Sequence, residues 1–119
     1  MKIQIAIADD HLMVINGIQK MLSVFPDIVI TDTYVNGDEL LQGMEIRQPD
    51  VLLLDIQMPG KTGDKLAPAL LKKHPELRIL VLTNFDSVFY VKKMMGNGAL
   101  GYLLKSTDPK TFTEAIRTV

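Results

Sequence analysis

A ten-residue stretch near the middle of the chain, VLLLDIQMPG at residues 51–60, constrains the fold most strongly. Four aliphatic residues lead directly into the carboxylate of Asp55, and Pro59 and Gly60 then interrupt the chain. A short apolar run that ends in turn residues is typical of a strand buried on both faces, as in a parallel sheet. Because ligands bind beside the carboxyl ends of such strands, Asp55 occupies a position suited to chemistry. An aspartate before Pro-Gly can also simply cap a turn. The residues at the other strand ends must therefore decide whether Asp55 has a functional or a structural role.

Strand-like and helix-like segments alternate along the rest of the chain. Apolar or β-branched runs predict strands at residues 2–8, 28–34, 51–55, 78–83 and 99–104. Apolar residues at helical spacing predict helices at residues 11–24, 38–47, 63–73, 87–95 and from 109 onward. This alternation requires parallel strands, right-handed crossovers and helices on both faces of the sheet. We therefore predict a flavodoxin-like α/β fold, a doubly wound five-stranded (βα)5 sheet with strand order 2-1-3-4-5.

Size and composition restrict the class of protein. The 119 residues suffice for one compact domain with a real core. The chain has no cysteine, which excludes disulfides and thiolate metal sites and suits a reducing cytosol. The net charge of −1 predicts no broad basic surface for nucleic acid. The sequence has no stretch typical of a signal peptide or a membrane span, so we expect a cytoplasmic domain without a membrane partner.

Charged and hydroxyl side chains follow four of the five predicted strands. They are Asp9 and Asp10 after the first strand, Asp55 at the third, Thr83 at the fourth and Lys105 at the fifth. In the predicted order the first and third strands are neighbours, so three carboxylates meet beside one hydroxyl and one ammonium. Three ionised acids need a counter-charge, and an all-oxygen set of ligands suits Mg²⁺, with Mn²⁺ as an alternative.

This combination of groups is suited to phosphoryl transfer. A divalent cation would neutralise charge on an incoming phosphoryl group, while Lys105 and Thr83 would hold its other oxygens. One carboxylate would then act as the nucleophile and form an aspartyl phosphate, and Asp55 suits this role because it stands alone and central. Each residue by itself has a structural explanation, and only the set favours chemistry. Neither His11 nor His74 has the sequence spacing that is typical of metal ligands.

Four motifs, in order along the chain, resemble the receiver domain of two-component response regulators. They are DDH at 9–11, PDVLLLDIQMPG at 49–60 followed by Gly63, LT at 82–83, and GALGYLLK at 98–105. The resemblance covers residues 1–119, and the DDH and GYLLK motifs are similar to those of the NarL/FixJ (LuxR-type) branch. Members of that branch usually carry a helix-turn-helix DNA-binding domain after the receiver. We therefore expect the N-terminal part of a longer regulator, which contacts DNA only through a C-terminal domain outside this sequence.

The resemblance implies a phosphoacceptor and a metal site. Asp55 would take a phosphoryl group from a phosphohistidine on a sensor histidine kinase. Mg²⁺ would be bound by Asp10, Asp55 and the backbone carbonyl of Gln57, with Asp9 supporting the metal through water. The family consists of signalling domains rather than enzymes, since a receiver catalyses only its own phosphorylation and dephosphorylation.

The resemblance also implies a switch. Lys105 would contact the phosphoryl group, Thr83 would move toward it, and Tyr102 would turn inward behind Thr83. This movement would remodel the face formed by the fourth helix, fifth strand and fifth helix, and so control an effector that we expect to act in transcription. Aromatic residues are common in strands, so Tyr102 also has a purely structural interpretation.

Two local features give further expectations about the structure. Ser106 follows Lys105 at a position where many receivers have proline after a cis bond. A cis Lys105–Ser106 bond would cost about 2.5–4 kcal/mol relative to trans. We nevertheless expect it, because Lys105 must point back into the site.

In the fourth helix, capped by Ser87, the core side is expected to comprise Val88, Val91 and Met95. Phe89 and Tyr90 would then be exposed, an apolar surface for phosphorylation-dependent dimerisation or for docking an effector domain.

Three other functions have to be weighed. A haloacid-dehalogenase-type phosphohydrolase shares the nucleophile, metal and lysine, but it expects a second acid where this chain has Gln57, and a cap domain. A flavodoxin-like cofactor binder needs a phosphate-cradling loop after the first strand, where Asp9 and Asp10 would repel phosphate. A degenerate receiver that acts by protein binding alone would leave the acid cluster without a role.

Overall fold

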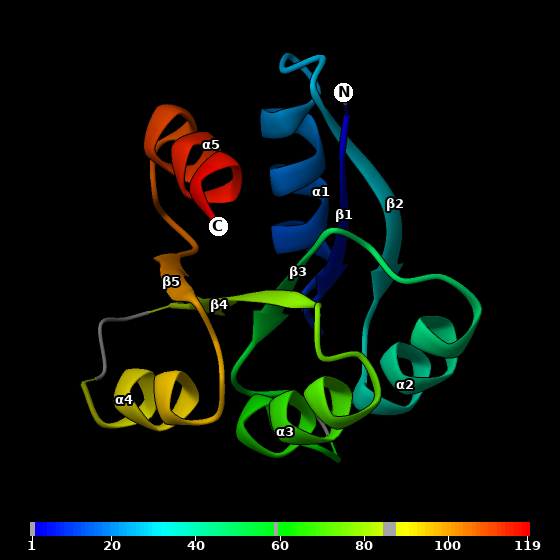
Figure 1. Cartoon of the computed structure of the whole chain (residues 1–119). Coiled ribbons are helices and arrows are strands. Elements are labelled where there is room, and N and C mark those ends of the chain that lie inside the picture. The colour runs from blue at the N-terminus through cyan, green and yellow to red at the C-terminus, as the bar shows by residue number, and fades with distance from the viewer. Residues whose placement is uncertain (1, 59, 85–87) are drawn as a thin grey trace.

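The computed structural model describes residues 2–58, 60–84 and 88–119 of the chain, and it has the predicted architecture (Figure 1). Five parallel strands form one sheet in the order β2-β1-β3-β4-β5. The strands are β1 (Ile3–Ala8), β2 (Ile28–Tyr34), β3 (Val51–Asp55), β4 (Arg78–Thr83) and β5 (Gly101–Leu104). The helices are α1 (Leu12–Leu22), α2 (Gly37–Ile46), α3 (Gly63–Lys73), α4 (Val88–Gly96) and α5 (Pro109–Thr118).

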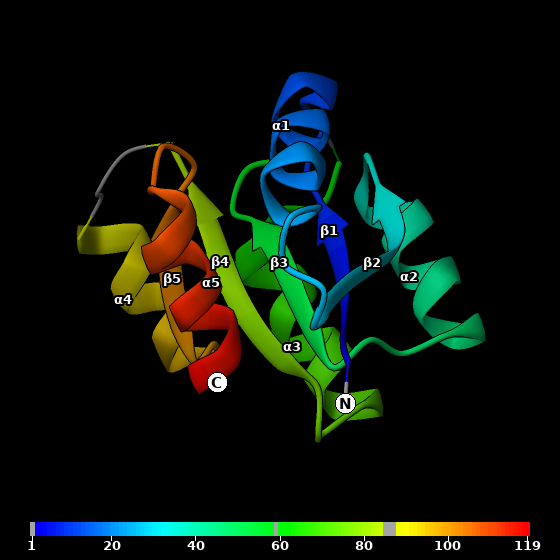
Figure 2. The ribbon, with the colours of Figure 1, turned by 90° about the horizontal axis from the view of Figure 1, so that it is seen from above.

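The sheet separates two layers of helices. Helices α1 and α5 cover one face, and α2, α3 and α4 cover the other (Figure 1). The strands lie side by side with their arrowheads toward one edge of the sheet (Figure 2), as parallel pairing requires. No helix within the described residues is long and apolar enough to cross a membrane.

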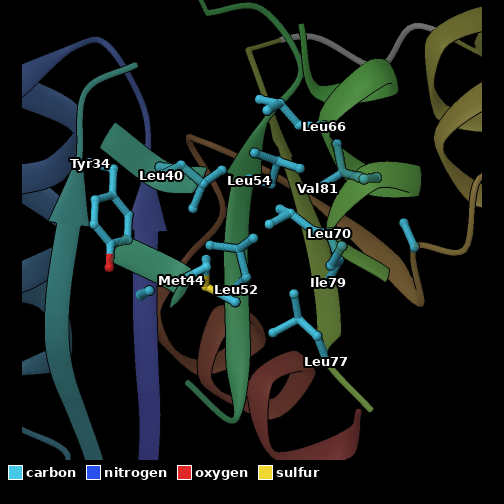
Figure 3. Close-up of a cluster of buried hydrophobic side chains, with 14 of the residues drawn as sticks. Tyr34, Leu40, Met44, Leu52, Leu54, Leu66, Leu70, Leu77, Ile79 and Val81 are labelled. Atoms are coloured by element: carbon cyan, nitrogen blue, oxygen red, sulfur yellow. The ribbon is translucent and has the colours of Figure 1, made fainter. Parts of the chain in front are cut away.

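Strand β3 contributes to both hydrophobic cores. Leu52 and Leu54 belong to the core under α2, α3 and α4 (Figure 3), whereas Val51 and Leu53 belong to the core under α1 and α5. All four side chains are at most 1% exposed. Successive strand residues point to opposite faces, so an apolar residue at each position is required to fill both layers.

The predicted boundaries agree with the structure to within two residues, and helix α5 begins with a side-chain cap. The side chain of Asp108 accepts a hydrogen bond of 3.0 Å from the Thr111 N–H at the start of α5, which satisfies an N–H that lacks a partner within the helix. The expected cap of α4, Ser87, lies outside the described residues.

The predicted core face of α4 is wrong in part. Met94 is completely buried, Met95 is 43% exposed and Val91 is half-buried. The backbone explains the difference, because the carbonyl of Met94 accepts the Ala99 N–H as the chain turns back toward β5. This turn brings Met94 against the sheet and leaves Met95 on the outside. The Val88 and Tyr90 side chains lie outside what is described, whereas Phe89 is exposed, as expected.

Helix α3 begins in direct contact with the end of β3. The Gly63 N–H donates a 2.7 Å hydrogen bond to the Ile56 carbonyl. A Cβ atom at Gly63 would lie 2.8 Å from the Asp55 carbonyl oxygen and 3.0 Å from the Ile56 Cα. These neighbours are backbone atoms that cannot rotate away, so this approach requires glycine.

Replacing Gly63 by alanine is therefore expected to lower the free energy of unfolding by about 1–3 kcal/mol, because the backbone after Asp55 must shift. Gly17 in α1 is the matched control, since a Cβ there meets nothing within 4 Å. Gly17→Ala should raise the unfolding free energy by up to about 1 kcal/mol through helix propensity. Urea unfolding followed by circular dichroism measures both, and a destabilisation shared by the two variants would contradict the steric explanation.

Candidate functional site

The polar residues predicted at the strand ends lie together at one edge of the sheet. β1 and β3 are neighbours, with Ala8 paired to Leu54, so the residues that follow them are brought together. At the other side of β3, the Lys105 N–H donates a 2.8 Å hydrogen bond to the carbonyl of Thr83, which aligns the ends of β4 and β5. Parallel topology thus places Asp9, Asp10, Asp55, Thr83 and Lys105 at the same edge.

Three carboxylates and a histidine form a compact cluster. Asp9 is completely buried and Asp55 is 4% exposed, whereas 26% of the Asp10 side chain is accessible. Each of these acids and His11 offers a possible ligand atom, and the four atoms lie within 4.8 Å of one another. Carboxylate oxygens at this density are the ligands that divalent cations such as Mg²⁺ prefer.

A single buried lysine faces two of these acids. The Lys105 Nζ lies 2.8 Å from Asp9 Oδ2 and 3.3 Å from Asp55 Oδ2, and its side chain is only 6% exposed. Charge is therefore unbalanced, with three carboxylates near one ammonium. Low solvent access makes this imbalance more costly than at the surface.

The pKa of Asp55 is raised to about 6. Burial is the main cause, and the neighbouring Asp9 carboxylate adds to it. The Lys105 ammonium and a 3.3 Å hydrogen bond from the Gln57 N–H act in the opposite direction without cancelling the increase. Asp55 is therefore an acid whose ionised form needs further positive charge.

Three buried carboxylate oxygens accept no hydrogen bond: Asp9 Oδ2, Asp10 Oδ1 and Asp55 Oδ2. Lys105 compensates the first and third of them only through its ionic contacts. Buried polar atoms normally have partners, so these oxygens indicate a ligand site. The residues present fit a divalent cation, because carboxylate oxygens that accept no hydrogen bond come from both sides of the β1–β3 junction.

A small cavity of about 40 Å³ lies beside the cluster. This volume exceeds the roughly 10–15 Å³ that one water molecule needs, so small groups can enter. Its lining consists of His11, Asp55, Ile56, Gln57, Thr83, Asn84 and Lys105.

Tyr102 does not belong to this cavity. It lies on the edge strand β5, opposite Val81 of β4, and is 41% exposed. The structure therefore brings together the predicted acids, Thr83, Lys105 and the Gln57 backbone, but it leaves Tyr102 pointing into solvent.

One expectation is wrong, and one residue at the site was not expected there. The Lys105–Ser106 peptide bond is trans, since no described peptide bond is cis. A peptide bond before serine strongly prefers the trans form. Lys105 also reaches Asp9 and Asp55 from the trans backbone, so a cis bond is not needed. His11, which the sequence pattern did not single out as a ligand, lines the cavity with Nδ1 3.2 Å from carboxylate oxygens of both Asp9 and Asp10. Its position directly after Asp9 and Asp10 in the sequence was the signal that could have placed His11 at the site.

Comparison with known proteins gives the family. The sequence pattern of the response regulator receiver domain matches residues 5–117. The transcriptional regulatory protein DegU of Brevibacillus brevis is 35% identical over 99% of this chain and 50% of its own length. The oxygen regulatory protein NreC of Staphylococcus carnosus is 37% identical over 98% of this chain and 54% of its own length. The chain thus spans about half the length of these relatives.

A solved structure agrees with this match. The LuxR-family DNA-binding response regulator from Staphylococcus aureus superimposes with a TM-score of 0.88 and 28% identity, over 98% of this chain and 97% of that one. The chain therefore belongs to the response regulator receiver domain family, in its NarL/FixJ (LuxR-type) branch.

Proposed function

We propose that Asp55 is the phosphoacceptor of this receiver domain and takes its phosphoryl group from the phosphohistidine of a sensor histidine kinase. The observation that carries the proposal is the set of buried acids with unpaired oxygens around one buried lysine. Of the three acids, Asp55 is the one that lines the cavity, and it shares the Lys105 ammonium with Asp9. Family membership supports the same assignment.

We infer that Mg²⁺ is the cation of this site, with Mn²⁺ as a substitute. Asp10, Asp55 and the Gln57 carbonyl would hold it, and Asp9 would support it through water. When bound, the cation supplies positive charge to the phosphoryl oxygens. The Asp55 carboxylate attacks phosphorus, the histidine nitrogen leaves, and Lys105 and Thr83 hold the oxygens of the transferred group.

The dehalogenase-type alternative is not favoured. That chemistry needs an acid at the position of Gln57, whose exposed amide cannot deliver a proton to a leaving group. The domain is a signalling domain, and we propose that its only catalysis is its own phosphorylation and dephosphorylation. The intact set of acids, lysine and threonine also argues against a degenerate receiver that acts by protein binding alone.

We propose that phosphorylation is transmitted through Thr83 and Tyr102 to the face formed by α4, β5 and α5. Tyr102 is 41% exposed on the edge strand, so its ring is not fixed by burial in the core. Two relatives are named as regulators and about twice as long as this chain, so we infer control of transcription through a DNA-binding domain outside this sequence. From family membership we also infer a cytoplasmic location.

Intact mass measured after incubation with a small-molecule phosphodonor tests the acceptor. The wild type should gain one phosphoryl group only when Mg²⁺ is present, and the group should be stable in acid and labile in base. Asp55→Asn should gain none, because the nucleophilic oxygen is lost. Failure of the wild type to gain mass under any condition would refute the phosphoacceptor role and leave the degenerate receiver.

The raised pKa of Asp55 predicts a pH-dependent effect on stability. The pKa is about 6 in the folded domain and 3.8 for the ordinary side chain, so ionisation favours the unfolded state and the wild type loses stability as pH rises through 6. In metal-free buffer Asp55→Asn should therefore be more stable than the wild type by up to about 3 kcal/mol at pH 8. The difference should shrink toward pH 4.

Urea unfolding of both proteins in EDTA at pH 4, 6 and 8 measures this difference, and saturating Mg²⁺ at pH 8 should reduce it by stabilising the wild type. A difference that is constant across pH would show that charge at Asp55 is not its cause.

Exposed apolar side chains near β5 support phosphorylation-dependent dimerisation. Leu100 is 53% exposed just before β5, which carries the exposed Tyr102, and Phe89 on α4 is 69% exposed. In sedimentation velocity, phosphodonor and Mg²⁺ should convert monomer to dimer in the wild type, and Leu100→Glu should prevent this. Ile46→Glu is the control, since Ile46 is 86% exposed on α2, which lies by β2 at the far edge of the sheet from β5 (Figure 1). Equal dimerisation of Leu100→Glu and Ile46→Glu would exclude this face.

A further inference from the structure

His11 stands at the entrance of the acidic cluster, and its ring has no structural task in its own helix. It is the N-cap residue of α1, with extended backbone, but its side chain makes no capping hydrogen bond. The ring instead turns toward the acids, where Nδ1 shares a 3.2 Å hydrogen bond with Asp9 Oδ1 and lies 3.2 Å from Asp10 Oδ1. The side chain is 57% exposed and lines the same cavity as Asp55.

The contact with Asp10 is close without being a hydrogen bond. Asp10 Oδ1 is buried and accepts no hydrogen bond, although the imidazole nitrogen is 3.2 Å away. Two ligands that occupy neighbouring positions around one cation at about 2.1 Å lie roughly 3 Å apart. The imidazole nitrogen and the carboxylate oxygen therefore have the spacing of two ligands of a shared ion.

We propose that His11 is a nitrogen ligand of the cation site, so that the site binds first-row divalent transition ions more tightly than Mg²⁺. This inference takes the location of the cation site from the proposed function. It adds one ligand, His11, and a preference for one class of metal ion. Mg²⁺ favours oxygen ligands, whereas transition ions gain affinity from imidazole. A site in which the imidazole joins two carboxylates and a backbone carbonyl therefore discriminates between these classes of ion.

The contrasting explanation is that His11 acts only as a counter-charge for Asp9 and Asp10. In that case it competes with every cation, and its removal strengthens the binding of Mg²⁺ and of transition ions alike. The two explanations thus predict opposite changes for the same variant, which makes them separable by measuring affinity.

Isothermal titration calorimetry of the 119-residue chain with Co²⁺ and, separately, with Mg²⁺ tests the proposal. The wild type should bind Co²⁺ at least about tenfold more tightly than Mg²⁺. His11→Ala should lose about tenfold or more in Co²⁺ affinity, with a far smaller change for Mg²⁺. His74→Ala is the matched control, because His74 is the only other histidine and lies at the far end of α3 from the cluster. It should bind both ions as the wild type does.

Proton NMR of the two histidine rings gives a readout that is independent of affinity. Paramagnetic Co²⁺ at one equivalent should shift and broaden the ring signals of His11 and leave those of His74 in place. Unchanged His11 signals, equal losses of Co²⁺ and Mg²⁺ affinity in His11→Ala, or stronger binding of both ions would each overturn the proposal.

The proposed function is tested separately by phosphorylation of the wild type with Mg²⁺. Phosphorylation together with metal binding that does not depend on His11 would refute the nitrogen ligand and leave the phosphoacceptor role standing. A wild type that binds neither ion would overturn both.

Discussion

Three carboxylates that share one buried ammonium impose the main electrostatic constraint on this domain. Lys105 contacts Asp9 and Asp55 but leaves carboxylate oxygens without hydrogen bonds. Burial and the neighbouring Asp9 carboxylate together raise the pKa of Asp55 to about 6. Like charges this close repel one another, so the surrounding fold must hold them in place. The apolar strands β1 and β3, which are buried on both faces, supply that restraint.

The gathering of these acids could be predicted from sequence because it follows from topology. Alternating strands and helices fix parallel pairing, and parallel pairing places all carboxyl ends at one edge of the sheet. Asp9, Asp55 and Lys105 are distant in sequence, but each directly follows or ends an apolar strand, so their meeting required no knowledge of side-chain packing. Short-range patterns were therefore sufficient for the site's principal residues.

Features that depend on tertiary packing could not be predicted from the sequence as well. Which of Met94 and Met95 is buried depends on how the chain leaves α4, and helical periodicity over nine residues does not distinguish them. The trans bond after Lys105 follows from local amide energetics, which the resemblance to proline-containing relatives obscured. His11 lies next to two acids in sequence, but only the backbone at the start of α1 turns its ring toward them.

The division of β3 between two cores has a consequence for the motions available to the site. Leu52 and Leu54 fill one layer, Val51 and Leu53 fill the other, and Asp55 follows without a break. A slip of one residue would exchange every side chain between the layers, so local fluctuation of the strand cannot separate Asp55 from its neighbouring acids. Only a ligand, protonation of an acid such as Asp55 or global unfolding relieves the repulsion. Ligand affinity and domain stability are therefore linked through the same electrostatic free energy.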